Sequence, residues 1–272
     1  MLSNTTIGFI GAGNMAGALI EGLLANGVTP ARLWASDTDA AKLAALAARG
    51  VRTSLANTEL VAACDVLVLA VKPQVMAAVV SDLKDVLAGK SCLLVSIAAG
   101  IQLASLQQWT SPQQAIVRCM PNTPALVLAG ATGAVANAQV SRQQRDVADA
   151  LLKAVGIVCW LDSEEQIDAV TAVSGSGPAY YFLMMEAMQA AGTKLGLPAD
   201  IAKALTLQTA FGAAKLALNS DVDAAELRRR VTSPKGTTEA AIKQFESDCF
   251  RDIVDRALGK AAARSRELAA GK

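Results

Sequence analysis

Short apolar runs alternate with stretches of helical periodicity over the first 160 residues of the chain. The runs cover residues 6–10, 33–35, 66–71, 92–97, 115–119 and 158–160. Two of them, VLVLAV at 66–71 and CLLVSI at 92–97, are apolar at nearly every position, as strands covered by helices on both faces should be. Strands that alternate with helices are typical of βαβ units, so this part of the sequence predicts a parallel sheet.

After about residue 163 the pattern is helical to the end of the chain. It predicts helices over 179–195, 198–219 and 223–231, a turn at 233–236, and two further helices beyond that turn. Apolar residues such as Leu205, Phe211 and Leu218 suggest more apolar helix surface than one chain can bury. We therefore expect a sheet domain over residues 1–162 and a helical domain over residues 163–272, and we expect the helical domain to form a homodimer.

Several helix ends are marked by their capping residues. Ser141 with Gln144, and Ser163 with Gln166, each show the S-x-x-Q pattern that predicts a capping box. Gly27 and Gly50 are predicted to end the helices that precede them.

The composition excludes several classes of protein. Hydrophobic residues make up 53% and charged residues 18% of the chain, so we do not expect disorder. The 25 Lys and Arg against 24 Asp and Glu leave a net charge of +1, which supplies no excess positive field for nucleic acid. The uncharged run at 169–185 is too short for a typical membrane span and is interrupted by Gly175 and Pro178. We predict that the protein binds neither nucleic acid nor membrane.

The chain contains no histidine. Ser-His-Asp and Cys-His catalysis and most catalytic zinc sites require an imidazole, so these chemistries are excluded. The five cysteines are widely spaced and form no C-x-x-C pair, which favours reduced thiols over disulfides or a thiolate metal cluster. We therefore expect a cytoplasmic protein without a metal cofactor.

A glycine-rich segment follows the first predicted strand. In GFIGAGNMAG, residues Gly11, Gly13 and Ala16 form a G-x-G-x-x-A pattern at the opening of a predicted helix. In a dinucleotide-binding turn the first glycine permits the tight turn, the second lets backbone amides approach the pyrophosphate, and the third small residue allows close packing of helix on strand. Such turns also occur as purely structural features. The position after the first strand of a βαβ array favours dinucleotide binding.

The end of the second predicted strand is where a dinucleotide-binding domain contacts the adenosine ribose. The sequence there is Ser36, Asp37 and Thr38. A carboxylate at this point would bind the 2′-hydroxyl of NAD and repel the 2′-phosphate of NADP, whereas the two hydroxyls could donate to that phosphate. Asp37 could instead cap the next helix and face away. The sequence leaves these alternatives open.

Later strands are also followed by short loops. Lys72 follows the strand at 66–71, and loops of small residues follow at 96–100 and 120–124. The carboxyl ends of parallel strands face the ligand crevice, so we expect these loops to lie there, where small residues would admit a nicotinamide ring. Lys72 could also be a solvated side chain before a helix that begins at Pro73.

Two segments of the helical half carry further candidate chemistry. The glycines of SGSGPAY at 174–180 would let a helix start approach the cofactor crevice, or would pack against another helix. VTSPKGTTE at 231–239 is a turn that leads into a helix, with hydroxyls beside free backbone amides, and it suits a small carboxylate. Ser233 or Thr237 could also simply cap that helix.

Three further segments are RCMPNTP at 118–124, AVKP at 70–73 and DAVTAVSGSGPAY at 168–180. Together with the glycine-rich segment at 8–17 and the turn at 231–239, they closely resemble the pyrroline-5-carboxylate reductase family, and the resemblance covers essentially the whole chain. The resemblance implies an α/β Rossmann-type domain followed by an all-α dimerisation domain. It implies reduction of 1-pyrroline-5-carboxylate to L-proline by NAD(P)H, the last step of proline biosynthesis. It also implies a homodimer, which in this family often assembles further into a decamer of five dimers.

The resemblance also assigns residues to the site. The cofactor contacts fall on Ile10, Gly11, Ala12, Gly13, Asn14, Met15, Ser36, Asp37, Asn57, Ala70, Val71, Lys72, Pro73, Ile97, Ala98 and Ala99. The substrate contacts fall on Ser176, Ser233, Lys235, Gly236, Thr237 and Thr238, with Thr238 and Ser233 as the catalytic pair and Thr238 facing the imine nitrogen. NADP(H) is the favoured cofactor. NAD(H) stays open as an alternative, because Asp37 departs from the hydroxyl shown by relatives that favour NADPH.

This reaction suits a chain without histidine. A protonated cyclic imine is already a good hydride acceptor, so the protein mainly has to hold it against the nicotinamide and satisfy its charge. A neutral ketone would need a strong general acid. Two alternatives are a reductase of a related cyclic imine, such as the six-membered ring, and a dinucleotide sensor that turns nothing over. The intact SPKGTT turn argues against the sensor.

Overall fold

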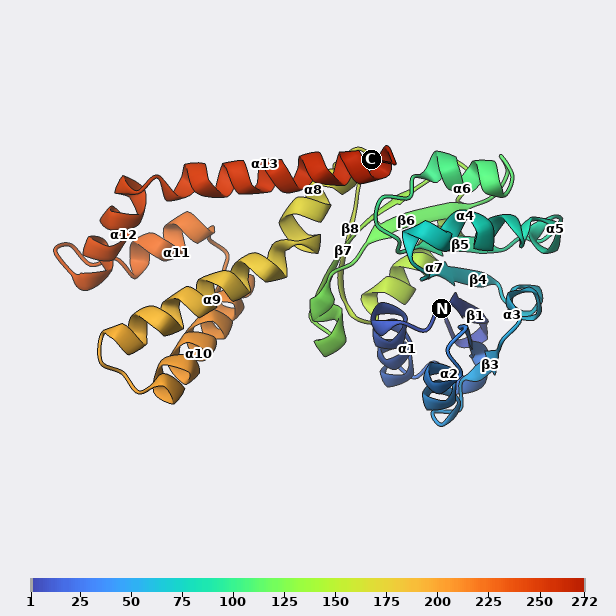
Figure 1. Ribbon diagram of the computed structural model, residues 1–272, viewed down its shortest axis with the longest axis horizontal. Helices are drawn as coiled ribbons and strands as arrows, with labels where there is room; N and C mark the ends of the chain where they lie inside the picture. Colours follow the sequence, from blue (N-terminus) through green and yellow to red (C-terminus); the bar gives the residue numbers. More distant parts are fainter. Residues whose placement is uncertain (1, 272) are drawn as a thin grey trace. The chain divides into compact units, whose positions relative to one another are not determined.

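The computed structural model of the protein describes residues 2–271. Contacts within the chain divide it into two compact units. The first unit contains the sheet and comprises the residues up to Ser176 together with those from Ala261 onward. The second unit is helical and covers Gly177–Lys260. Figure 1 shows the helices and strands of each unit.

The first unit is built on one sheet, whose strands within the described residues follow the order β3-β2-β1-β4-β5-β6-β7-β8. They are β1 (Ile7–Ile10), β2 (Leu33–Ser36), β3 (Arg52–Ser54), β4 (Val66–Leu69), β5 (Leu93–Ser96), β6 (Ile116–Met120), β7 (Gly130–Ala136) and β8 (Gly156–Trp160). Neighbouring strands pair in parallel except β6 and β7, which are antiparallel. The order 3-2-1-4-5 is that of a Rossmann fold, so the predicted fold class is confirmed.

Two strands lie outside the runs that the sequence predicts. The strand β3 has three residues, all polar, at one edge of the sheet. The strand β7 reads GATGAVA, which has small residues in place of an apolar run. A Cβ atom on Gly133 would come within 2.7 Å of the Val170 side chain, so a larger residue would be excluded by the helix that packs there.

Helices cover both faces of this sheet (Figure 1). They are α1 (Asn14–Ala25), α2 (Ala40–Ala47), α3 (Asn57–Ala63), α4 (Pro73–Ser81), α5 (Lys84–Leu87), α6 (Leu103–Trp109), α7 (Arg142–Lys153) and α8 (Gln166–Val170), with short turns η1 (Leu2–Asn4), η2 (Pro30–Arg32), η3 (Thr123–Val127) and the π-helical η4 (Thr171–Gly175). In β4, Val66 and Val68 join a core with α1, α2 and α7, whereas Leu67 and Leu69 join a second core with α3, α4 and α6. Successive residues of a strand point to opposite faces, which is why the run is apolar throughout.

The predicted helix ends are partly confirmed. Ser141 and Gln144 form the reciprocal capping box at the start of α7. At Ser163 the expected box is wrong: Gln166 Oε1 accepts a hydrogen bond from the Ser163 amide at 3.2 Å, but α8 has Glu165 as its N-cap without a side-chain cap. The helix begins too late for the Ser163 hydroxyl to cap it. Gly27 and Gly50 adopt positive φ after α1 and α2, as predicted.

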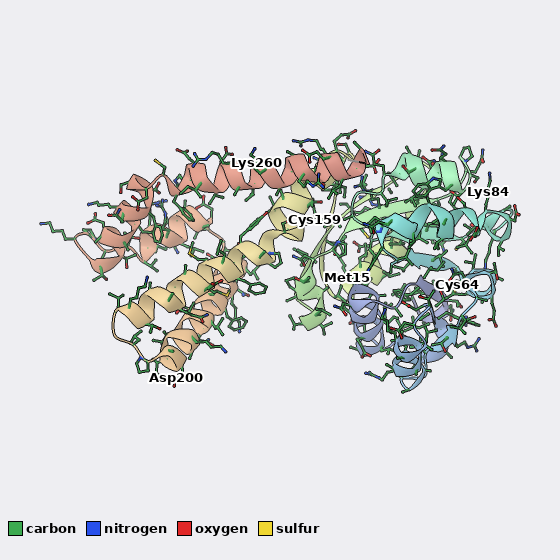
Figure 2. All side chains as sticks on the ribbon, viewed as in Figure 1. Met15, Cys64, Lys84, Cys159, Asp200 and Lys260 are labelled. Carbon is green, nitrogen blue, oxygen red and sulfur yellow. The ribbon has the colours of Figure 1, made fainter. Side chains whose placement is uncertain are left out.

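The second unit contains α9 (Gly177–Lys194), α10 (Ala199–Leu218), α11 (Ala224–Arg230), α12 (Thr237–Ser247) and the first part of α13 (Phe250–Ala269). The helices α9 and α10 lie side by side as a hairpin (Figure 1). Many of their apolar side chains, drawn in Figure 2, are exposed, including Leu205 at 55%, Phe211 at 62% and Leu218 at 83%. The chain by itself therefore leaves a large apolar surface on this unit uncovered, as the sequence predicts.

Two features are absent from the described part of the chain, residues 2–271. None of its helices combines the length and apolar character needed to cross a membrane. Its Cys, Asp and Glu side chains form no group of three or more that could hold a metal ion.

Candidate functional site

The glycine-rich loop connects β1 to α1 at the carboxyl edge of the sheet. Gly11 has φ +96°, and a Cβ atom there would lie 2.6 Å from the Ala70 carbonyl oxygen, so the turn requires glycine. A Cβ atom on Gly13 would meet nothing within 4 Å, which leaves that side of the loop open. The helix α1 begins after Gly13 without a side-chain cap and without an acidic residue in its first turn. Its first backbone amides therefore fit the pyrophosphate of a dinucleotide.

The side chain of Asp37 faces this loop from the end of β2. Its Oδ2 accepts a hydrogen bond from the Ala12 amide at 2.8 Å, and its Oδ1 accepts one from the Asp39 amide at 2.8 Å. Partial burial acts to raise the pKa of Asp37, but these amides and the nearby Lys42 ammonium outweigh it and hold the pKa below the usual 3.8. The carboxylate is therefore ionised at neutral pH. The helix α2 is capped by Asp39, so the alternative that Asp37 caps it is wrong.

Ser36 and Asn57 form a pair beside Asp37. Ser36 is 1% exposed, and its hydroxyl donates to Asn57 Oδ1 at 2.7 Å. Asn57 is the first residue of α3 and is half-buried. The Ser36 hydroxyl is buried and its proton is used in this hydrogen bond, which orients the Asn57 side chain. Because Asn57 is only half-buried, it is the more accessible of the two polar groups.

The ends of four parallel strands meet at the same edge as the glycine-rich loop. Ile10 at the end of β1 pairs in register with Leu69 of β4, and Leu69 pairs with Ser96 of β5. Ser96 in turn is in register with Arg118 of β6. The loops at 70–73, 97–99 and 120–124 therefore come together with residues 10–15, as the sequence predicts.

Lys72 lies in this group of loops. It is the N-cap residue of α4, with Pro73 at the first helical position, and its side chain is exposed. The placement is compatible with a cofactor contact and also with a solvated lysine, so its role stays a prediction.

The SGSG segment packs against the loop after β6. Asn122 Nδ2 donates to the backbone oxygen and the hydroxyl of Ser174, each at 3.2 Å, and a Cβ atom on Gly175 would lie 2.6 Å from Met120 Cε. The turn is π-helical and closes with a hydrogen bond from the Ser176 amide to the Thr171 carbonyl at 2.8 Å. These contacts place Ser176 near the carboxyl end of β6, and π-helical turns of this kind are frequent at functional sites.

The turn at 233–238 lies in the second unit. The helix α12 has Gly236 as its N-cap and no side-chain cap, so the alternative that Ser233 or Thr237 caps it is wrong. Glu239 Oε2 accepts a hydrogen bond from the Lys235 amide at 2.9 Å, which together with Lys243 lowers the pKa of Glu239. The amides at positions 237–239 are left without intrahelical acceptors. They can bind a small carboxylate next to the Thr238 hydroxyl.

Sequence reasoning missed the charged pair that supports this edge of the first unit. Arg118 is 4% exposed and donates to Glu164 Oε1 at 2.7 Å, and the same oxygen accepts a hydrogen bond from the Leu103 amide at the start of α6. The feature that could have indicated this pair is the arginine inside the apolar run IVRCM, because a buried arginine requires a charged or polar partner. The partner itself, 46 positions away, could not be read from the pattern.

This sheet and loop define a dinucleotide-binding oxidoreductase with a separate helical unit. A family model described as pyrroline-5-carboxylate reductase dimerisation matches residues 164–268, and one described as NADP oxidoreductase, coenzyme F420-dependent, matches residues 6–100. The pyrroline-5-carboxylate reductase of Pseudomonas aeruginosa is 57% identical over 269 residues, covering 98% of both chains. That of Pasteurella multocida is 42% identical and covers 97% of both chains.

Two solved structures that resemble this chain over its whole length are of the same kind of enzyme. The pyrroline-5-carboxylate reductase of Coxiella burnetii is 44% identical with a TM-score of 0.95, covering 97% of this chain and 98% of that one. The enzyme of Plasmodium falciparum, solved with NADP bound, is 30% identical with a TM-score of 0.86, covering 98% and 99%. The chain belongs to the pyrroline-5-carboxylate reductase family. It is an NAD(P)-dependent oxidoreductase that acts on the CH–NH group in proline biosynthesis, and its dimerisation domain marks it as an oligomer.

Proposed function

We propose that the chain reduces 1-pyrroline-5-carboxylate to L-proline with the residues described above in defined roles. The proposal rests on the uncapped start of α12 in a chain that is 57% identical to a reductase of this substrate. NAD(P)H supplies the hydride. The imine carbon accepts that hydride, the ring nitrogen carries one proton, and a secondary amine results.

The cofactor half of the site lies in the first unit. The amides at the start of α1, with residues 10–15, would hold the pyrophosphate, and Asp37 and Asn57 would contact the adenosine ribose. Residues 70–73 and 97–99 would surround the nicotinamide end, since these loops follow the neighbouring strands β4 and β5. The loop after β5 contains Ala98 and Ala99, whose small side chains would admit the ring.

The substrate half uses two segments. The amides at 237–239, with Lys235 and Gly236 shaping the turn, would bind the substrate carboxylate, because an uncapped helix start attracts an anion. Ser233, Ser176 and the Thr237 hydroxyl would complete the contacts. The protonated ring nitrogen would donate a hydrogen bond to Thr238 Oγ1, which orients the imine carbon. Positioning of this kind supplies much of the rate when the acceptor is already activated by protonation.

NADP(H) is the proposed preferred cofactor. The matching family model is described as an NADP oxidoreductase, and the Plasmodium falciparum relative was solved with NADP. The ionised Asp37 beside the Ala12 amide opposes a 2′-phosphate and favours a free 2′-hydroxyl, so we expect measurable activity with NADH as well.

The proposed assembly is a homodimer formed by the second unit, with further association into a decamer of five dimers. The exposed apolar side chains of α9 and α10 support the dimer. A cytoplasmic location is proposed from the five free cysteines, of which Cys64, Cys92 and Cys119 are buried.

Oxidation of NADPH with 1-pyrroline-5-carboxylate supplied tests the proposed reaction directly. We expect turnover of this imine to exceed that of the six-membered cyclic imine. A higher kcat/KM for the larger ring would change the substrate. Tight NADPH binding without turnover of either ring would indicate a sensor instead of an enzyme.

A further inference from the structure

The last turns of α13 belong to the first unit, where they contact residues that are distant in the sequence. Ser265 is 7% exposed, and its hydroxyl donates to Asp168 Oδ1 at 2.6 Å across 97 positions of chain. One turn further on, Leu268 lies against Gly100, where a Cβ atom would come within 3.5 Å of the Leu268 backbone. The segment 261–269 therefore contacts both α8 and the loop after β5.

Asp168 connects this segment to the candidate substrate contacts. It lies in α8, a helix of five residues that continues directly into the π-helical η4. At the end of η4, Ser174 is held by Asn122, and Ser176 closes the turn through its amide. Because α8 and η4 are one continuous backbone, a shift of α8 along its axis would move Ser176 relative to β6.

We propose that Ser265 is a positioning residue for catalysis: its hydrogen bond to Asp168 fixes α8 and η4 and so places Ser176 for the substrate. The inference rests on the proposed function in assigning Ser176 to the substrate. The segment 166–175 is held to the sheet through the buried side chain of Ile167, and the bond from Ser265 adds a polar contact from the last turns of α13. The bond to a carboxylate is of the stronger, charge-assisted kind.

Removal of the Ser265 hydroxyl should leave a folded protein. Asp168 lines a cavity of about 360 Å³ together with Arg118, Glu164 and Arg266. Its carboxylate is half-buried, so water in that cavity can replace the lost donor and no buried charge is left unpaired. An effect on catalysis can thus be separated from loss of the fold.

The test compares Ser265→Ala, Ser265→Thr and the control Thr110→Val. Thr110 is 3% exposed and follows the carboxyl end of α6, where its hydroxyl donates to the Leu106 carbonyl one turn back, so this control removes a buried hydroxyl without touching α8. For Ser265→Ala we expect KM for 1-pyrroline-5-carboxylate to rise about tenfold, the effect of losing a charge-assisted hydrogen bond, while Kd for NADPH stays within about twofold. Ser265→Thr should restore KM, and Thr110→Val should leave it unchanged.

Hydrogen exchange of the Ser176 amide supplies a readout that does not depend on turnover. Exchange should be faster in Ser265→Ala and normal in Ser265→Thr. The proposal would be overturned by unchanged exchange in Ser265→Ala or by a KM that stays high in Ser265→Thr. An equal rise of KM in Thr110→Val would overturn it as well. Absence of turnover in the unaltered chain would instead overturn the proposed function, and with it the substrate role of Ser176, whereas exchange would still decide whether Ser265 positions η4.

Discussion

The Asp37 carboxylate has a structural role in the glycine-rich loop and a proposed role in recognition of the ribose. It holds the Ala12 amide of the glycine-rich loop and lies where the ribose of a dinucleotide would bind. Since its pKa lies below 3.8, the charge is present throughout the neutral range and would be lost only as the pH falls below that value. The structural role needs only an acceptor, whereas discrimination against a 2′-phosphate needs the charge.

The Asp37→Asn substitution separates these roles, because asparagine removes the charge and keeps one acceptor oxygen for the Ala12 amide, while the exposed Asp39 amide loses its acceptor. We expect the ratio of kcat/KM for NADPH to that for NADH to rise about tenfold, since a negative charge beside the 2′-phosphate costs about 1.4 kcal/mol or more. The matched control is Asp39→Asn two positions on, where asparagine is an equally good helix cap. An equal change of the ratio in both variants, or none in Asp37→Asn, would show that Asp37 does not read the ribose.

The Thr238 hydroxyl can be removed with little change of shape by Thr238→Val. If it orients the ring nitrogen, kcat/KM for the imine should fall about 10- to 100-fold, as expected for the loss of one hydrogen bond in the transition state, while NADPH binding is retained. Stopped-flow or steady-state NADPH oxidation measures the first quantity and fluorescence titration the second. Thr193→Val, which removes an exposed hydroxyl on α9, should behave as the unaltered chain. Full activity of Thr238→Val would remove this role.

At the scale of elements, the turn before α12 places a residue with a side chain, Lys235, in a backbone conformation that favours glycine. Lys235 has φ +60°, a conformation that costs an L-residue roughly 1 kcal/mol and glycine almost nothing. Its amide is used by Glu239, whereas its ammonium is exposed. The turn is therefore held by its backbone and not by the lysine side chain.

We expect Lys235→Gly to raise the free energy of unfolding relative to Lys235→Ala by about 1 kcal/mol, because alanine keeps the strained Cβ atom. If the amides of α12 bind the carboxylate, kcat/KM should stay within about threefold in both variants, since one exposed charge contributes little. Denaturant unfolding and the imine assay measure the two effects. A loss of more than tenfold in both variants would assign the carboxylate to the lysine side chain instead.

Sequence periodicity did not predict the elements whose residue types are determined by contacts with a neighbouring element. The central strands β4 and β5 are buried on both faces and read as apolar runs, so they are predictable. The strand β7 carries Gly133 because Val170 of α8 lies over it, and its pairing with β6 is antiparallel. Neither fact leaves a local periodic signal. The S-x-x-Q pattern at Ser163 shows the reverse case, a local signal that the later start of α8 overrides.

At the scale of the whole molecule, the exposed apolar side chains of α9 and α10 predict association. Sedimentation velocity should give a species larger than the monomer, and Phe211→Asp, which places a charge in that surface, should weaken association at least tenfold. The control is Leu55→Asp, because Leu55 is 76% exposed on the first unit. A concentration-independent monomer, or dissociation by the control as well, would count against an interface at this surface. Species of ten chains would support the decamer.

The sequence by itself determined the βαβ order, the glycine-rich loop after the first strand, the helical second half and the resemblance that the comparisons confirmed. These features are local, because a turn, a cap or a buried strand is encoded within a few neighbouring residues. The tertiary structure alone decided which way Asp37 faces and what Ser265 holds. Their partners are 25 and 97 positions away, and only the strand order and the packing of α13 bring them within hydrogen-bond distance. Such distant contacts leave no periodic trace, so the sequence allows Asp37 either to cap the next helix or to face the glycine-rich loop, and its bond to the Ala12 amide selects the second.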